Sequence, residues 1–205
     1  MERYQDYVIK DGRFVGKFEE MYQKFDDPWH QSNIVDVGGG FSRLATIVNI
    51  KKFGIKSVVE FGCGFGYYAN FISQYTKARV KGIDISSTAI EKARSLYPSI
   101  EFGVDKIQNI ETYTEYESVL FAEITWYILD DINMIFEKML KHFSGKYFLH
   151  NLVFYKGQQK YGTEYFTNLK EFIDYVPFKL VGYAEATTVD SDTTETSTIF
   201  EITKK

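Results

Sequence analysis

The sequence predicts an α/β domain in which a mostly parallel, seven-stranded sheet is covered by helices on both faces. Short β-branched apolar runs alternate with stretches of helical apolar spacing, as in sheets whose strands are joined by helices. A glycine-rich turn follows the first run, and two longer strand-like segments end the chain as an antiparallel hairpin. With 205 residues and 44% hydrophobic content, one domain (1–205) accounts for the chain. We expect a helical lid over residues 1–52 and the sheet-containing core over residues 53–205.

The lid is predicted to contain two helices. Apolar side chains recur at helical spacing over residues 13–25, and Pro28 prevents that helix from continuing. Ser42 is expected to cap a second helix that ends near Lys52. We interpret the glycine-rich segment 36–40 between them as a flexible hinge.

The core begins with an apolar strand over residues 57–61 that contains Glu60 and leads into Gly62, Gly64 and Gly66. Helical spacing starts directly after these glycines. Glycine lets the backbone reverse tightly and come close to a ligand, and the helix start offers unpaired N–H groups and a positive dipole. The turn is therefore predicted to hold a small polar ligand.

The glycine spacing argues against a dehydrogenase. The dinucleotide pattern G-x-G-x-x-G needs a glycine where Tyr67 stands, and no second catalytic domain follows. The pattern E-x-G-x-G-x-G instead resembles motif I of class I S-adenosylmethionine-dependent methyltransferases, which have a Rossmann-like fold. This resemblance implies S-adenosyl-L-methionine as cofactor, bound by Glu60, Gly62, Cys63, Gly64 and Gly66. An ordinary turn between strand and helix is the alternative for so short a motif.

Acidic residues also end the next two predicted strands. Asp84 closes residues 79–84, about 20 residues past the glycines, where a carboxylate can accept bonds from both ribose hydroxyls. Its alternative role, capping the next helix, is already available to Ser86 or Ser87. Asp105 closes residues 99–105, and the resemblance implies that it accepts from the adenine amino group. The resemblance also places four neighbours at the cofactor, namely Ile85, Lys106, Ile107 and Ile124.

The rest of the core alternates strands and helices. Strands are expected over residues 117–123 and 145–151, helices from residue 130 or 131 to about 143 and over 168–175, and the hairpin over 178–188 and 194–203. Glu123 then lies where motif IV approaches the methyl donor. His150 lies at the carboxyl end of its strand, the edge at which open α/β sheets bind ligands.

The amino-terminal segments 18–22 and 26–31 resemble the start of NodS-like small-molecule methyltransferases. There an acidic-Pro-Trp loop and the following helix cover the cofactor, and an arginine of that helix meets the methionine carboxylate. Arg43 is the candidate here, since a guanidinium binds a carboxylate in bidentate fashion. A surface charge at a helix start is the alternative for Arg43. Trp29 and His30 would form part of the lid over cofactor and acceptor.

Methyl transfer mainly requires donor and acceptor to be held in line, and a base is needed only when the acceptor loses a proton. We rank His150 first as that base because an imidazole titrates near neutral pH. Glu123 is second and His30 third, while an imidazole satisfied by backbone groups is the alternative for His150. Expected acceptor contacts are Trp29, His30, Tyr127 and His150.

A metal-assisted reaction of the catechol type is not expected. The acids and amides available near the fourth and fifth strands, Glu123, Asp130, Asp131 and the pair His150-Asn151, match that metal site only loosely. Aspartates before a helix are more often caps.

Composition limits the partners. The net charge is −4 without a basic patch, which argues against nucleic acid. No apolar run resembles a signal peptide or a membrane span, and the single cysteine fits a reducing compartment. We therefore expect a cytoplasmic protein that acts away from membranes, and its oligomeric state stays open.

Three functions are compared. The first is an S-adenosylmethionine-dependent methyltransferase acting on a small polar metabolite through oxygen or nitrogen. NodS-like resemblance implies a sugar, a nucleotide-linked sugar or a phosphorylated intermediate of a surface polysaccharide pathway. The second is a protein or RNA methyltransferase, which the charge disfavours. The third is a non-catalytic, cofactor-binding partner of a heteromeric enzyme.

Overall fold

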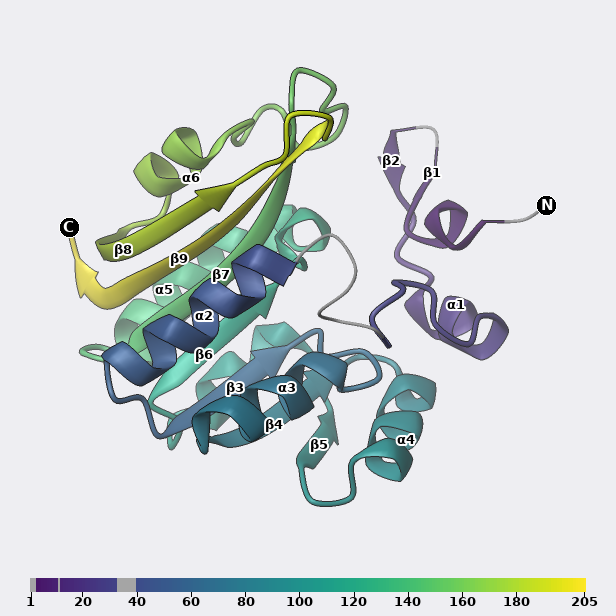
Figure 1. Ribbon diagram of the computed structural model, residues 1–205, viewed down its shortest axis with the longest axis horizontal. Helices are drawn as coiled ribbons and strands as arrows, with labels where there is room; N and C mark the ends of the chain where they lie inside the picture. Colours follow the sequence, from purple (N-terminus) through teal and green to yellow (C-terminus); the bar gives the residue numbers. More distant parts are fainter. Residues whose placement is uncertain (1–2, 11, 33–39) are drawn as a thin grey trace.

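The predicted α/β architecture is confirmed by a computed structural model that describes residues 3–10, 12–32 and 40–205 (Figure 1). Its main sheet has seven strands in the order β5-β4-β3-β6-β7-β9-β8. The strands are β3 (Ser57–Phe61), β4 (Arg79–Asp84), β5 (Glu101–Val104), β6 (Ser118–Ala122), β7 (Tyr147–Tyr155), β8 (Phe178–Ala186) and β9 (Thr193–Lys204). Strands β3 to β7 are parallel, whereas β9 pairs antiparallel with both β7 and β8.

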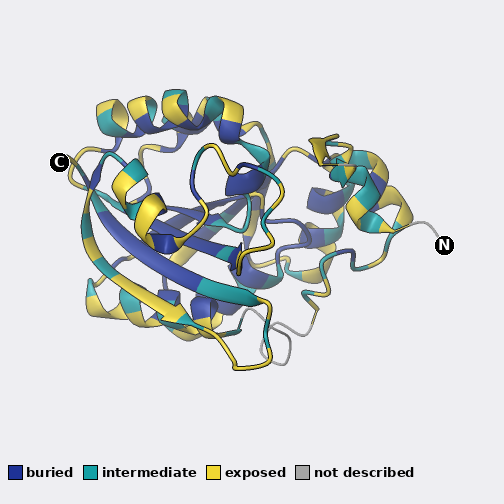
Figure 2. Cartoon of the chain, turned by 90° about the horizontal axis from the view of Figure 1, so that it is seen from above, coloured by how far each residue is buried: buried dark blue, intermediate teal, exposed yellow. Residues whose placement is uncertain are grey.

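Helices cover both faces of this sheet (Figure 1). One layer contains α2 (Gly40–Lys52), α3 (Tyr67–Thr76) and α4 (Ser87–Leu96), and the other contains α5 (Ile132–His142) and α6 (Leu169–Tyr175). The described part of the chain also contains four short 3-10 helices: η1 (Tyr4–Tyr7), η2 (Ile107–Tyr113), η3 (Thr125–Tyr127) and η4 (Leu129–Asp131). The central strands are buried, and the edge strand β8 carries many exposed residues (Figure 2). Among the described residues, no helix is long and apolar enough to cross a membrane.

The amino-terminal prediction was wrong in detail. The helix expected over residues 13–25 is the shorter α1 (Phe18–Lys24), preceded by a hairpin of β1 (Ile9–Lys10) and β2 (Arg13–Phe14). Gly12 and Gly16 adopt positive φ, +73° and +67°, which bends the chain on either side of β2 and prevents an earlier helix start.

Helix α2 also differs from its prediction. It begins at Gly40, so Ser42 lies inside the first turn instead of capping it, and the expected hinge falls largely outside the described residues. Buried side chains of α2 pack against β7 and β9. Helix α2 is therefore part of the layer that covers the sheet, although the predicted boundary at residue 52 groups it with the lid.

Two predicted helix caps can be checked directly. Ser86 is the cap of α4, because its side chain accepts a hydrogen bond from the backbone N–H of Ala89. Asp131 holds the N-cap position of α5 but makes no capping bond, since its carboxylate accepts from the side chain of Gln108.

Candidate active site

The glycine turn after β3 is closely packed. Gly62 has a φ of +72°, and a Cβ built there would lie 2.2 Å from Cγ2 of Ile124. Gly64 has a φ of +53°, and its Cβ would lie 2.8 Å from the hydroxyl of Tyr22 on α1. Both positions require glycine for their conformation and for the space that they leave to neighbouring segments.

The acids at the ends of the first core strands lie at one edge of the sheet. Asp84 is buried and accepts two backbone hydrogen bonds, from Gly64 N to Oδ2 and from Ser86 N to Oδ1, each 2.9 Å long. The backbone N–H of Asp105 donates to the carbonyl of Asp84 (3.1 Å). Burial raises the pKa of Asp84, with these backbone bonds acting in the opposite direction. Asp84 thus joins the glycine turn to the start of α4.

Glu60 lies behind the turn and is only 2% exposed. Its Oε2 has no hydrogen-bond partner among the described residues. Burial raises the pKa of Glu60 to about 8, and the nearby guanidinium of Arg43 acts in the opposite direction. A buried carboxyl oxygen without a partner offers an acceptor for a ligand donor, because such groups are normally satisfied.

Arg43 projects from α2 into the same region. It is 9% exposed, its guanidinium lies 5.5 Å from the ring centroid of Tyr68, and its charge favours ionisation of both Glu60 and Glu123. Arg43 is therefore a buried residue close to Glu60 and Tyr68, and it is not the surface charge that the alternative interpretation expected.

A polar network that sequence reasoning missed anchors α2 beside Arg43. The hydroxyl of Tyr68 donates to Asn151 Oδ1 (3.0 Å), and Asn151 Nδ2 donates to the carbonyl of Ser42 (3.1 Å). Thr46 lies 3.0 Å from Ser197 through its hydroxyl, and it also contacts Asn151. Thr46 lies on the buried side of α2 together with Ser42, Arg43, Ile47 and Ile50.

Asp105 is held by its own loop. Its Oδ1 accepts from the backbone N–H of Lys106 and from Asn109, each at 2.7 Å, and its Oδ2 accepts from the hydroxyl of Tyr113 at 2.8 Å. Burial opposes ionisation, but these bonds outweigh it and lower the pKa of Asp105. Lys106 is exposed and Ile107 is buried, while Ile85, directly after Asp84, is 52% exposed.

Glu123 occupies an unusual backbone position at the end of β6. Its φ is +63°, which is rare for a residue with a side chain, and its N–H donates to the carbonyl of Asn151. Oε2 accepts from the backbone N–H of Val153 (2.9 Å). Burial raises the pKa of Glu123 to about 7, and Arg43 is the main opposing influence. A partly exposed carboxyl that titrates near neutral pH is suited to general base chemistry.

His150 lies in the core. Strand β7 continues to Tyr155, so His150 is mid-strand and faces the α5–α6 layer, where its ring stacks on Phe172 at 4.1 Å between centroids. It is fully buried, its Nε2 lies 2.7 Å from the hydroxyl of Thr125, and burial lowers its pKa to about 3. This placement argues against His150 as the base and favours the alternative of a structural imidazole.

Aromatic side chains of the lid gather over the end of β6. Trp29 donates to the hydroxyl of Tyr22 (3.0 Å), and its ring lies 6.0 Å from that of Tyr127 and 5.2 Å from that of Tyr4. His30 is exposed, has a φ of +52°, and contacts Tyr4 edge to face at 5.9 Å. The structure therefore brings the predicted acceptor contacts Trp29 and Tyr127 together, with His30 at the rim.

A cavity of about 320 Å³ lies between the first turn of α2 and the segment that joins β8 to β9. Val153, whose N–H binds the Glu123 carboxylate, lines it together with Phe41, Thr187, Ser191, Thr193 and Glu195.

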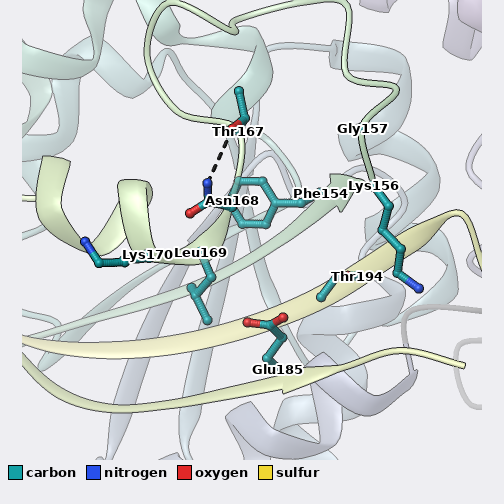
Figure 3. Close-up of a pocket in the computed structure, with 9 residues that line it drawn as sticks. All are labelled: Phe154, Lys156, Gly157, Thr167, Asn168, Leu169, Lys170, Glu185 and Thr194. Carbon is teal, nitrogen blue, oxygen red and sulfur yellow. Dashed lines mark hydrogen bonds between the residues drawn. The ribbon is translucent and has the colours of Figure 1, made fainter.

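A second cavity, of about 380 Å³, lies between α6 and the hairpin strands (Figure 3). Its lysines are already engaged, Lys170 with Asp174 (2.8 Å) and Lys156 with the carbonyl of Ser191 (2.8 Å). Phe154, which lines this cavity, faces the α5–α6 layer, whereas Val153 faces the α2 side. The smaller cavity is therefore the one on the same side of the sheet as α2.

Part of the chain is similar to known methyltransferases. Residues 58–144 match the family model described as a methyltransferase domain. A 75-residue segment is 37% identical to the putative methyltransferase 235L of Invertebrate iridescent virus 6, and this match spans 36% of the present chain and 28% of the viral protein.

The fold is similar to that of solved methyltransferases. The N-methyltransferase NodS from Bradyrhizobium japonicum, solved with S-adenosyl-L-homocysteine, superposes with a TM-score of 0.68 at 15% identity over 89% of this chain and 96% of NodS. An S-adenosylmethionine-dependent methyltransferase from Clostridium acetobutylicum gives 0.65 at 12% identity over 89% and 99% of the two chains. Residues 58–144 are therefore similar to a methyltransferase domain, and the chain has the fold of the class I S-adenosylmethionine-dependent methyltransferases.

Proposed function

We propose that the protein transfers the methyl group of S-adenosylmethionine to a small polar acceptor. One observation carries this proposal: Glu60, Asp84 and Arg43 converge on a single glycine turn in a methyltransferase domain. A dehydrogenase would not need a buried arginine beside the carboxyl group of Glu60 at this turn.

The chain offers a complementary group for each part of the cofactor. Arg43 would bind the methionine carboxylate, and the unpartnered Oε2 of Glu60 would accept from the amino group. Asp84 would accept from the ribose hydroxyls with the lone pairs that its two backbone bonds leave available. Ile85, being apolar and exposed beside Asp84, offers a surface for the adenine ring. Solved NodS contains S-adenosyl-L-homocysteine, the product form of this cofactor.

When bound, S-adenosylmethionine supplies a sulfonium methyl group that is already activated for transfer. The protein then has to exclude water, align the acceptor and remove a proton where the acceptor atom carries one. Glu123 is our candidate for the base that accepts this proton, because its carboxyl group, at the end of β6, has a pKa of about 7. Tyr127 and Trp29 would cover the acceptor from the lid side.

The lining of the 320 Å³ cavity narrows the class of acceptor. Among the described residues, this lining has several hydroxyl groups, one carboxylate (Glu195) and no lysine or arginine. Phosphate groups are usually bound by cationic side chains, whereas sugar hydroxyls and amines bind carboxylates and hydroxyls. Within the proposed class of sugar-like intermediates of surface polysaccharide synthesis, we therefore favour a neutral or amino-bearing acceptor over a phosphorylated one.

Calorimetry with S-adenosylmethionine and S-adenosylhomocysteine is the first test. We expect both to bind, and NAD not to bind. A radiolabelled methyl donor should then label neutral or amino sugars in preference to sugar phosphates. Binding without turnover on any acceptor would instead support the non-catalytic partner, and absence of cofactor binding would contradict the proposal.

A further inference from the structure

Glu19 on α1 makes a concentrated set of contacts to another helix. Its carboxylate accepts from the hydroxyls of Ser86 (2.5 Å), Thr88 (2.6 Å) and Ser87 (3.3 Å) and from the backbone N–H of Thr88 (3.4 Å). All of these donors belong to the first turn of α4 or its cap, 67 to 69 residues away in the sequence. Figure 1 shows α1 beside α4.

The contact continues to the glycine turn. The backbone N–H of Ser86 donates to Asp84 Oδ1, and Asp84 Oδ2 accepts from Gly64 N. A single chain of hydrogen bonds therefore links Glu19, Ser86, Asp84 and Gly64. Any movement of Glu19 away from α4 removes one support of the turn that positions Asp84.

Glu19 differs in this respect from its neighbour. Glu20 is exposed and pairs with Lys17 within the same helical segment at 3.0 Å, a type of contact that contributes little. The hydroxyl bonds from Ser86 and Thr88 lower the pKa of Glu19 to about 2, so it is ionised throughout the neutral range.

Two further contacts hold α1 and the loop that follows it. Lys92 on α4 donates to the carbonyl of Asp26 (2.9 Å), and its ammonium lies 4.5 Å from the ring centroid of Phe65. The hydroxyl of Tyr22 lies over Gly64. Helix α1 thus spans the glycine turn, with Glu19 at one end and Asp26 near the other.

We propose that Glu19 is a positioning residue that fastens α1 over the cofactor turn and, through Ser86, holds Asp84 in the orientation needed to bind the adenosyl ribose. This inference rests on the proposed function for its ligand. It makes Glu19 a determinant of how long the cofactor stays bound, although Glu19 itself touches no reacting atom.

The test compares Glu19→Gln with Glu20→Gln, which makes the same chemical change one residue further on α1. We expect Glu19→Gln to weaken S-adenosylhomocysteine binding about tenfold or more, mainly through faster dissociation, because the acceptor loses its charge and one of its two accepting oxygens. Glu20→Gln should bind like the unmodified protein. Thr88→Val should weaken binding in the same direction, and combining it with Glu19→Gln should add less than the sum of the two changes.

Hydrogen exchange without any ligand separates this proposal from the proposed function. Faster exchange in residues 18–24 of Glu19→Gln, at an unchanged global melting temperature, is the expected result. Equal exchange and equal dissociation rates in the two glutamine variants would overturn the role of Glu19. If the unmodified protein failed to bind S-adenosylhomocysteine, the positioning role would fall together with the proposed function, whereas altered exchange alone would show only a structural contact.

Discussion

The two halves of the sheet edge are built differently. In the half formed by β3, β4 and β5, two of the acids are held at the ends of their strands: Asp84 accepts from two backbone amides, and Asp105 accepts from its own loop. In the half formed by β6 and β7, the groups depend on distant segments. Glu123 is fixed by Val153 of β7, and Tyr127 lies under Trp29 of the lid.

This difference shows which half can vary without loss of the fold. The half formed by β3, β4 and β5, which we call the cofactor half, holds Asp84 and Asp105 through the turns and loops at the ends of its strands. The acceptor half combines a strained Glu123, lid aromatics and the loop between β8 and β9, so its specificity can change through surface segments. Four substitutions or measurements test this division.

The largest expected effect is on turnover. Glu123→Gln should lower kcat by about 10²–10⁴-fold with a hydroxyl acceptor, the usual contribution of a general base, and leave S-adenosylhomocysteine affinity nearly unchanged. In the unmodified protein the rate should rise with pH through about 7, the pKa of Glu123, as the base ionises, and this limb should vanish in the variant. His150→Gln should reduce stability and spare turnover in the folded protein, and the reverse pattern would refute our assignment.

The next largest effect is expected at the glycine turn. Gly62→Ala should lower the free energy of unfolding by about 2–5 kcal/mol, combining a positive φ with overpacking against the stiff side chain of Ile124. Gly145→Ala is the matched control, since its φ is +80° and nothing lies within 4 Å of the added Cβ. It should lose only about 1–2 kcal/mol. Equal losses in denaturant titrations would show that close packing at Gly62 has no energetic role.

A smaller effect on cofactor affinity should distinguish Asp84 from Asp105. Asp84→Asn should weaken S-adenosylhomocysteine binding by about 1–3 kcal/mol. The carboxylate accepts through both oxygens, whereas an amide has one oxygen and cannot serve the two backbone donors and the ribose together. Asp105→Asn should lose less, since the new amide can donate to Tyr113 and keep the remaining bonds. Calorimetry on both variants gives the comparison, and a larger loss at Asp105 would contradict it.

The final prediction concerns the pH dependence of stability. The pKa of Glu60 is about 8 in the folded chain against an ordinary value of 4.5, so the unfolded chain ionises first as pH rises. The free energy of unfolding should therefore decrease between about pH 4.5 and 8, and Glu123, with a pKa of about 7, acts in the same direction up to about pH 7. Glu60→Gln should make this decrease smaller in urea titrations at several pH values and leave the part that comes from Glu123. An unchanged slope would assign the effect to another group.

Patterns within single segments were sufficient to predict where the residues at the ends of β3 and β4 lie. Glu60, the glycines and Asp84 follow one another in a strand, turn and strand, and parallel strands place their carboxyl ends together. His150 was misjudged for a local reason: β7 extends four residues past the predicted end at residue 151, which turns a strand-end imidazole into a core residue. The network of Thr46, Tyr68 and Asn151 joins three elements and has no local pattern.

Local sequence patterns were sufficient to predict the alternation of strands and helices in the core, the glycine turn and the acids that follow it, because each depends on hydrophobic periodicity and backbone conformation within a few residues. The effect of Arg43 on both Glu60 and Glu123, the burial of His150 and the binding of Glu19 to the start of α4 could be seen only in the folded chain. Those outcomes depend on contacts between segments far apart in the chain, where side-chain direction and burial are set by packing.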